Sequence, residues 1–514
     1  MKTAPSHSRR LVQATSLVMV FFVLSKVFGL VRDIVITHQF GTSRTYDAYL
    51  AAFRIPDIIF TVVAGGALGS AFIPPFAAML ANGETHKAWK LASHIINLVT
   101  LTTTAFAVVA ALFADPIVAH VVAVGFTPDE QALTAHLMQL MLIAPIIFGV
   151  SGIVMGVLNS HHHFVLPALA PVLYNLGIIG GALFLAPALG PYGLAIGVVT
   201  GAALHLLVQV PWLVRARMQY APSLGVNDPG VRQVLRLMLP RTAGIAAVQL
   251  NFLVNTILAS TLPEGRLAAL NIAFALILLP EGVVAQSIAT VLFPTFAQQV
   301  ARGEHDAMRR TFSTAFRIVL FMTIPASIGL ILLGRPIIQL LYQRGAFDAE
   351  STAQTAWALQ FFAVGLLAQS GLEIITRAFY ALHDTATPVK VAVAAFVVNV
   401  ALSLLLIGRL EQGGLALANS IATTAEMLLC LYLLRGRLGG VDGRRIAGSL
   451  VKILLAAAVM GLALLILLNT AAGLSAWLLA FAGIGLGGAV FILAMFLLRS
   501  DEIALAWRLA RSRG

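Results

Sequence analysis

The stretch FIPPFAAMLANGE at residues 72–84 recurs as LFPTFAQQVARGE at residues 292–304. Phe76-Ala77 returns as Phe296-Ala297, and Glu84 returns as Glu304. The same spacing relates Pro116-Ile117 to Pro336-Ile337, Gly125 to Gly345 and Glu130 to Glu350. After a slip of one residue, it relates Pro167 to Pro388 and Gly193-Leu194-Ala195 to Gly414-Leu415-Ala416. A repeat unit of about 220 residues is too long for a solenoid and predicts two lobes of similar fold.

The composition predicts a polytopic membrane protein. The 514 residues are 59% hydrophobic and 11% charged, with a mean hydropathy of +0.92. Apolar runs of about 18 residues or more are long enough to cross a bilayer as helices. The runs predict fourteen spans, at residues 14–40, 48–80, 88–114, 131–158, 164–187, 190–214, 233–260, 267–300, 311–333, 351–382, 388–408, 413–434, 446–469 and 474–498.

The repeat and the spans together predict the domain organisation of an all-α protein. Six spans fall in an N-terminal lobe, residues 1–218, and six in a C-terminal lobe, residues 219–440. An even number of spans per copy makes the lobes parallel, about a pseudo-twofold axis along the membrane normal, as in many transporters. Residues 441–498 add two unpaired spans, and residues 499–514 form a basic cytoplasmic tail. The tail is expected to act as a positive-inside anchor, and a short interfacial helix is the alternative.

The distribution of basic residues tests the number of spans, because Lys and Arg gather in cytoplasmic loops. With the N-terminus inside, 21 of the 33 Lys and Arg fall in inner loops or termini. The outer loops hold only five, namely Arg44, Arg266, Arg335, Arg344 and Arg409. Both termini are therefore expected in the cytoplasm. The net charge of +12 follows from this topology and from contact with anionic lipid headgroups, so no nucleic-acid partner is expected.

Few residues suggest catalysis, cofactors or metals. Cys430 is the single cysteine, which excludes an intramolecular disulfide and a thiol-rich metal site. The run His161-His162-His163 has no nearby acidic or cysteine partner, so a solvated loop is expected there and no metal site. The chain carries no nucleotide-binding loop and no catalytic triad pattern. The sequence thus predicts neither an enzyme nor a cofactor.

Charged residues inside the first span are the main functional signal. The segment SKVFGLVRD, residues 25–33, contains Ser25, Lys26, Arg32 and Asp33. Seven residues make nearly two helical turns, so Ser25 lies above Arg32, and Lys26 lies above Asp33, on one polar flank. Ionisable groups at membrane depth usually line a polar cavity or pair with each other. The flank predicts a site for a phosphate-bearing substrate; a network that only fastens helices together is the alternative.

Further polar residues inside the spans are candidates for substrate or cation binding. Glu373 and Arg377 are four residues apart, which favours an i,i+4 ion pair, and Arg377 is a candidate substrate ligand. Glu281 lies between Pro280 and Gly282, where a broken helix exposes carbonyl groups. Candidate residues for coupling to a cation or proton are Glu281, Glu426 and Asn399. The other mid-span amides are expected mainly to form hydrogen bonds between helices.

Several motifs resemble the MurJ/MviN flippases of the multidrug/oligosaccharidyl-lipid/polysaccharide exporter superfamily, nearly from end to end. They are SKxxGxxRD at residues 25–33, Asp47-Ala48, AFRIP at residues 52–56, AFIP at residues 71–74, Asn159, Pro167-Ala168 with Asn175, Asn255-Thr256-Ile257, LYQRGAF at residues 341–347, RAFYA at residues 377–381, Asp384 and TPVK at residues 387–390. The resemblance implies fourteen spans and a flippase of the bacterial inner membrane. Such a protein moves lipid II, an undecaprenyl-diphosphate-linked peptidoglycan precursor, to the outer leaflet by alternating access, and so serves cell-wall synthesis and cell shape.

The sequence departs from the family pattern at two cavity positions where arginine is expected. Thr61 in the second span and Ala275 in the eighth span are neutral, and Glu281 adds a negative charge nearby. Two alternatives therefore stay open: an exporter of another polyprenyl-linked saccharide or of a small cationic molecule, and a membrane scaffold that transports nothing.

Overall fold

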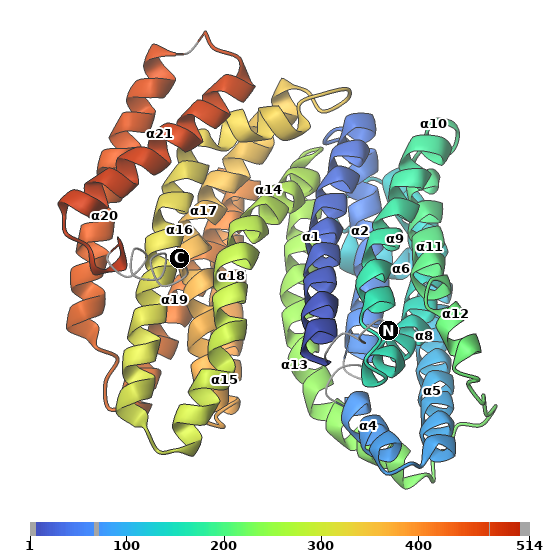
Figure 1. Ribbon diagram of the computed structural model, residues 1–514. Helices are drawn as coiled ribbons and strands as arrows, with labels where there is room; N and C mark the ends of the chain where they lie inside the picture. The colour runs from blue at the N-terminus through green and yellow to red at the C-terminus, as the bar shows by residue number, and fades with distance from the viewer. Residues whose placement is uncertain (1–6, 66–70, 472, 504–514) are drawn as a thin grey trace, which may run out of the picture. The chain divides into compact units, whose positions relative to one another are not determined.

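The computed structural model describes residues 7–65, 71–471 and 473–503, and the described segments are helices joined by short connections. The chain forms two compact units, one up to Glu264 and the other from Gly265 onward. Figure 1 shows long helices running along each unit. Residues 504–514, the larger part of the expected basic tail, lie outside the described residues.

Unit 1 contains all of the helices up to residue 260. They are α1 (His7–Phe40), α2 (Arg44–Ile59), η1 (Phe60–Ala64), α4 (Ile73–Ala81), α5 (Thr85–Leu112), α6 (Ala114–Ile117), η3 (Val118–Val122), α7 (Pro128–Met141), α8 (Ile143–Ser160), α9 (Val165–Gly180), η4 (Gly181–Leu185), α10 (Ala186–Leu189), α11 (Pro191–Leu207), α12 (Val210–Arg215) and α13 (Pro229–Ser260). The three η elements are single π-helical turns.

Unit 2 contains the remaining helices. They are α14 (Arg266–Glu281), the π-helical turn η5 (Gly282–Gln286), α15 (Ser287–Ala301), α16 (His305–Tyr342), α17 (Ala349–Ala381), α18 (Ala386–Leu410), α19 (Gln412–Arg437), α20 (Gly443–Thr470) and α21 (Ala476–Leu497). The last two helices, α20 and α21, lie side by side against α16 (Figure 1).

Eleven of the described helical segments are long and apolar enough to cross a membrane. They confirm a multi-pass helical protein and coincide with eleven of the fourteen expected spans. The expected spans at 14–40, 48–80 and 233–260 are not among the eleven. In the second of these, α2 is only 16 residues long and is followed by a π-helical turn and by residues 66–70, which lie outside the described part.

The bounds of the helices follow the repeat seen in the sequence. Helix α5 begins at Thr85 and α16 begins at His305, and each is preceded by a glutamate and a glycine. These glycines, Gly83 and Gly303, have φ angles of 75° and 71°, which glycine adopts without a steric penalty. Both α2 and α14 contain a proline in their last turn and lead directly into a π-helical turn.

The repeated phenylalanines quoted above lie in the cores of their units. Phe76 has no exposed surface, and its ring lies 5.1 Å from that of Phe72 and 6.1 Å from that of Trp89. Phe296 is equally buried in the core of unit 2, which also contains Phe312 and Phe316. Large apolar side chains such as Leu405 (73% exposed) remain outside these cores. A lipid environment covers such a surface, because acyl chains replace the missing protein contacts.

The expectation of a solvated His161–His163 loop is wrong for His161. Its ring stacks on Trp89 at 5.5 Å and meets Trp212 edge-on at 4.9 Å. Its Nδ1 also lies 3.0 Å from the carbonyl oxygen of Val157. The aromatic neighbours come from distant parts of the sequence, so the spacing around the histidines gave no sign of them.

The Asp384 carboxylate binds both the first turn of α18 and an arginine of α19. These contacts lead to a testable prediction. Its carboxylate accepts hydrogen bonds from the backbone N–H (3.0 Å) and hydroxyl (2.8 Å) of Thr387, and from Arg437 of α19 (3.1 Å). The bonds from Thr387, and then the charge of Arg437, lower the pKa of Asp384. The stabilisation is therefore complete above the unfolded pKa and is lost as the pH falls through the lower folded value.

We expect Asp384→Ala to lower the free energy of unfolding by about 1 kcal/mol at pH 7, the typical value of a helix-capping side chain. Thermal unfolding of the detergent-solubilised protein measures the difference. The gap between the two proteins should shrink below about pH 4, where the Asp384 carboxylate of the unfolded chain begins to take up protons, and should be lost as the pH falls through the lower pKa of the folded state. A gap that stays constant down to pH 3 would contradict the role assigned to the charged carboxylate.

Candidate functional site

The predicted polar flank of the first span lies on one continuous helix, α1. Arg32 donates from Nε (2.9 Å) and Nη2 (2.8 Å) to Oδ1 of Asp33. Its Nη1 donates to Oδ1 of Asn175 on α9, at 3.2 Å. Asn175 in turn donates to the carbonyl oxygens of Ser25 (3.5 Å) and Pro171 (3.0 Å). The structure thus joins Arg32, Asp33 and Ser25, although Ser25 takes part through its backbone.

Lys26 lies apart from this network. Its side chain is exposed, and its Nζ lies 5.7 Å from the centroid of the Phe22 ring. Lys26 has no carboxylate partner within the part of the chain that the structure describes. The Arg32 side chain is 29% exposed and is partly neutralised by Asp33. Of these two cations, Lys26 is therefore exposed and unpaired with any described carboxylate, whereas Arg32 is held in one orientation by Asp33 and Asn175.

A cavity of about 350 Å³ opens inside unit 1 beside Arg32. Its polar groups come from Arg32, Asp57, Tyr174 and His205. The rest of its lining is mainly apolar and includes Phe53, Pro56, Phe60, Phe148 and Met155. Mostly apolar walls with a few converging polar groups are typical of ligand-binding cavities, because the polar groups then orient the ligand.

His205 is anchored behind this cavity. Its Nδ1 lies 2.7 Å from the Ser151 hydroxyl, which also accepts a hydrogen bond of 2.9 Å from Gln209. All three side chains are buried. Sequence reasoning missed this group, since Ser151 and His205 lie in different helices and the spacing of the chain does not relate them.

Asp57 of α2 is held by residues of two helices. Gln249 of α13 donates to its Oδ2 at 3.0 Å, and Nη1 of Arg54 lies 4.0 Å from the same oxygen. Arg54 also donates to the Thr256 hydroxyl at 3.1 Å, and its guanidinium carbon lies over the Phe252 ring, 5.5 Å from the ring centroid. The expectation that mid-span amides join helices is confirmed for Gln249 and Asn175.

The candidate residues of unit 2 lie on four helices. The expected ion pair between Glu373 and Arg377 of α17 is present at 3.2 Å, with both side chains about one-third exposed. Glu281 is the last residue of α14, is 3% exposed and directly precedes the π-helical turn. Asn399 of α18 is buried and accepts a hydrogen bond of 3.4 Å from Ser403, whereas Glu426 of α19 is half-buried.

The two neutral positions are on the elements that precede or form the π-helical turns. Thr61 lies within η1 and Ala275 lies within α14, and both are half-buried. Arg54 and Asp57, one or two turns before Thr61, supply the nearest charges on α2. Within the described residues, no group of three or more His, Cys, Asp or Glu side chains is placed to hold a metal ion.

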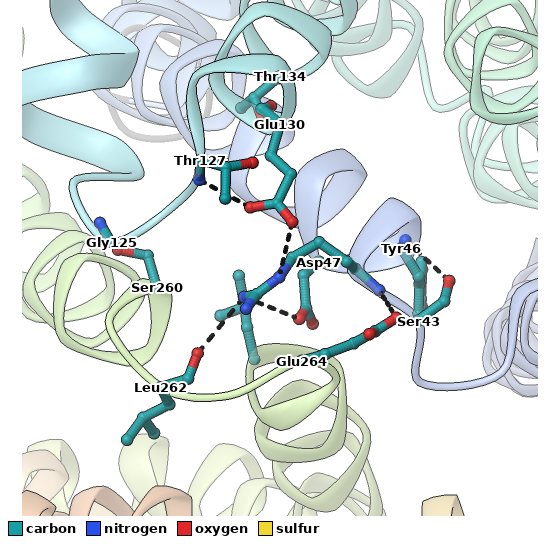
Figure 2. Close-up of polar contacts among 12 residues, drawn as sticks. Ser43, Tyr46, Asp47, Gly125, Thr127, Glu130, Thr134, Ser260, Leu262 and Glu264 are labelled. Carbon is teal, nitrogen blue, oxygen red and sulfur yellow. Dashed lines mark hydrogen bonds and ion pairs between the residues drawn. The ribbon is translucent and has the colours of Figure 1, made fainter.

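A cluster around Arg44, at the start of α2, was missed by sequence reasoning. Nε of Arg44 lies 3.3 Å from Glu130 of α7, and its Nη1 lies 3.8 Å from the fully buried Asp47. Its backbone N–H donates to Glu264 at 2.8 Å, and its Nη1 donates to the Leu262 carbonyl at 3.4 Å. Figure 2 shows these partners converging from α2, from the start of α7 and from the end of α13.

Unit 2 contains a similar cluster around Arg266, at the start of α14. Nη1 of Arg266 lies 3.6 Å from Glu350, the repeat partner of Glu130, and its Nε donates to Glu411 at 2.7 Å. The first arginine of the helix and the glutamate at the start of a later helix are thus paired in both repeats. The matched glutamates, together with an arginine at the start of both helices, are the sequence signal that would have predicted the clusters.

We expect Arg44→Met to destabilise unit 1 by about 2 kcal/mol, because it removes the ion pairs with Glu130 and Asp47, the hydrogen bond to the Leu262 carbonyl and the contact with the Phe126 ring at 5.0 Å. Thermal unfolding measures the loss. Arg335→Met is the matched control, since Arg335 is exposed and no ion pair is recorded for it among the described residues. Equal midpoints for both variants would refute a stabilising role for Arg44.

The fold and the charged groups within apolar helices together define a multi-pass helical membrane protein of the transporter class. Among solved structures, an inward-facing multidrug resistance MATE family transporter of the MOP superfamily has the same fold, with a TM-score of 0.69 and 14% identity over 83% of this chain and 98% of that one. "Lipid II flippase MurJ, inward closed conformation" matches with a TM-score of 0.82 and 25% identity, over 95% of this chain and 99% of that one.

The sequence comparisons identify the family. Residues 36–482 match the family described as "Lipid II flippase MurJ". A relative from Haemophilus influenzae, named "Probable lipid II flippase MurJ", is 32% identical over 86% of this chain and 89% of its own length. The chain belongs to the lipid II flippase MurJ family. The resemblance seen in the sequence motifs is confirmed.

Proposed function

We propose that this protein moves lipid II from the inner to the outer leaflet of the bacterial membrane by alternating access. Its family and its relatives carry that activity in their names. The observation that carries the proposal is the pair of cations on α1, an open Lys26 and an Arg32 oriented by Asp33 and Asn175. A diphosphate that leaves water for the membrane interior needs such cations, because charge-assisted hydrogen bonds replace its hydration.

The proposed architecture has fourteen spans. Two lobes of six helices, residues 1–218 and 219–440, are followed by two additional helices within residues 441–498. The matching helix bounds of α5 and α16, and of α2 and α14, support this division. Helix α13 packs on α2 and α5 in unit 1, so its proposed place in the second lobe rests on the number of expected spans alone.

The proposed location is the inner membrane, with both termini in the cytoplasm. The excess of Lys and Arg in the expected inner loops supports this orientation. A flippase of a precursor made in the cytoplasm would meet its substrate at this face. The partners in this proposal are lipid II, the surrounding membrane lipids and a coupling cation.

The roles proposed for single residues follow from their positions. Lys26 and Arg32 bind the phosphates, Asp33 positions Arg32 directly, Ser25 does so through Asn175, and Arg377 is a further candidate substrate ligand. Glu281, Glu426 and Asn399 are the candidates for coupling transport to a cation gradient. Expelling a negative substrate is also favoured by an inside-negative potential, by about 2.3 kcal/mol per charge per 100 mV.

A second candidate function is export of a different polyprenyl-linked saccharide or of a small cationic molecule. The neutral Thr61 and Ala275, together with the buried Glu281, favour it, since they leave fewer cations for a diphosphate. Such a protein would share the fold and the mechanism of alternating access but would not recognise lipid II.

Complementation tests the proposal. The chain is expressed in a bacterium depleted of its own lipid II flippase, and growth and cell shape are recorded. We expect rescue. Failure of a chain that reaches the membrane at normal abundance, together with no lipid II movement in vesicles containing the purified protein, would favour the second candidate function.

A further inference from the structure

A large basic cavity lies in unit 2, away from the residues discussed so far. Its volume is about 970 Å³, and it lies between the start of α16, the end of α19 and the start of α20. Five arginines line it, namely Arg309, Arg310, Arg435, Arg444 and Arg445, against a single carboxylate, Asp442. All five are in loops or helix ends that the sequence places on the inner side of the membrane.

One of these arginines, Arg309, is already bound to other groups of the protein. Arg309 pairs with Asp306, lies 4.0 Å from Asp442 and donates to the Gly439 carbonyl at 3.3 Å. These contacts hold the connection between α19 and α20 against α16. Arg309 therefore forms one side of the cavity, and its charge is largely balanced by Asp306 and Asp442.

The other four arginines are exposed and carry no ion pair among the described residues. Four cations around one hollow repel each other, which is unfavourable unless an anion is bound between them. Arginine presents donors in a fork that matches phosphate oxygens. The charge of the cavity therefore fits a phosphate group.

The cavity also has an apolar side. Leu428, Leu431, Tyr432 and Arg435 recur at helical spacing and so share one face of α19. Leu428 is 56% exposed and Tyr432 is 70% exposed. A free phosphate would gain nothing from such groups, whereas a lipid would place an acyl chain along them. Tyrosine is also typical of the boundary between headgroups and hydrocarbon.

We propose that this cavity binds the phosphate headgroup of an anionic glycerophospholipid from the inner leaflet. The phosphate lies among Arg310, Arg435, Arg444 and Arg445, and an acyl chain follows Leu428 and Tyr432. The site is separate from the α1 cations and does not depend on the identity of the transported substrate. It rests on the proposed orientation, in which these arginines face the headgroups of the inner leaflet. Basic pockets of this kind between membrane helices are known to hold anionic headgroups.

Native mass spectrometry of the purified full-length protein tests the proposal, with dioleoyl-phosphatidylglycerol as the probe. We expect the triple variant Arg435→Gln, Arg444→Gln, Arg445→Gln to weaken phosphatidylglycerol binding at least about tenfold, since each cation near the surface contributes to attraction. The matched control is Lys90→Gln, Arg215→Gln, Arg236→Gln. It removes the same charge from exposed residues of unit 1 and should change binding less than about twofold.

Further measurements separate a lipid from other ligands. Dioleoyl-phosphatidylcholine should bind much more weakly than phosphatidylglycerol, and millimolar inorganic phosphate should not displace the bound lipid. Leu428→Asn with Tyr432→Asn should weaken lipid binding although all the arginines remain. If the triple variant fails to fold, Arg435→Gln and Arg445→Gln alone carry the same test with smaller effects.

Three results would overturn the proposal. Equal loss of phosphatidylglycerol binding in the triple variant and its control would show that binding depends on the net charge of the protein and not on this cavity. Equal binding of phosphatidylcholine would indicate a non-specific lipid shell. If inorganic phosphate displaced the bound phosphatidylglycerol at the concentration at which free lipid displaces it, the cavity would be a site for small anions. None of these results depends on lipid II transport, so the two proposals fail independently.

Discussion

Lys26→Ala and Arg32→Ala are each expected to abolish rescue of a flippase-depleted bacterium while leaving the amount of protein in the membrane unchanged. Hydrogen bonds to charged groups contribute about 1.5–3 kcal/mol each. Lys26 is exposed and unpaired with any described carboxylate, so its loss removes binding energy without disturbing a recorded ion pair. A loss of that size lowers transport at least about tenfold for each variant.

The controls for this prediction use residues of matched chemistry. Lys390→Ala removes another exposed lysine that has no recorded ion pair in the described part of the chain, and it should rescue growth like the parent. Arg32→Lys keeps the charge but loses the paired donors to Asp33, so partial rescue is expected.

The measurement has two readouts, growth of the depleted strain and the thermal midpoint of the purified protein. Arg32 also joins α1 to α9 through Asn175, so a purely structural role would lower the midpoint together with growth. Loss of growth at an unchanged midpoint supports substrate binding. Full rescue by Lys26→Ala would contradict the proposed role of Lys26, because lipid II would then move without this cation.

Gly181→Leu is expected to destabilise unit 1 strongly, whereas Gly180→Leu should be tolerated. A Cβ atom at Gly181 would lie 2.5 Å from the Gly193 carbonyl oxygen and 2.6 Å from the Gly197 Cα. These are backbone atoms, which cannot move aside without separating η4 from α11. At Gly180 a Cβ atom would meet nothing within 4 Å.

The reason for the large effect is the close approach of these helices. Gly177 and Gly181 face Gly193, Gly197 and Gly201, and small residues at this spacing let membrane helices pack backbone to backbone. Overpacking a tight core costs about 1–3 kcal/mol and more where backbone must shift. We expect about 3 kcal/mol or more, equivalent to a fall in midpoint of roughly 10 °C for a unit of this size.

Thermal unfolding followed by size-exclusion chromatography compares the two variants directly. Because the two glycines are adjacent, the added side chain and its intrinsic helix propensity are the same in both variants. Equal thermal midpoints for Gly181→Leu and Gly180→Leu would show that η4 and α11 can move apart at little cost, contrary to the prediction.

Much of the helical architecture was predictable because it depends on local hydropathy. The span expected at 388–408 is α18 at Ala386–Leu410, and the span expected at 351–382 is α17 at Ala349–Ala381. The ion pair of Glu373 with Arg377 was predictable too, since it lies within one helix turn. The π-helical turns after α2 and α14 were not, because they depend on how each helix continues past its proline.

The candidate site was predictable only in part. The charges of α1 interrupt an apolar run, so Lys26, Arg32 and Asp33 could be predicted as candidate site residues from the sequence alone. Their neighbours were not, because Asn175 is 143 residues from Arg32 in the chain. The Arg44 cluster and the arginine cavity of unit 2 were also hidden, since each gathers residues from three separate segments.

The sequence by itself determined that this protein is a repeated bundle of membrane helices with cations inside its first expected span, because hydropathy and the repeat are properties of the linear chain. Only the tertiary structure decided which of those cations is paired and which is open. Arg32 is oriented by Asn175 of α9, whereas Lys26 lies beyond the reach of any described carboxylate. That difference depends on which helix faces which, and packing between distant segments sets it.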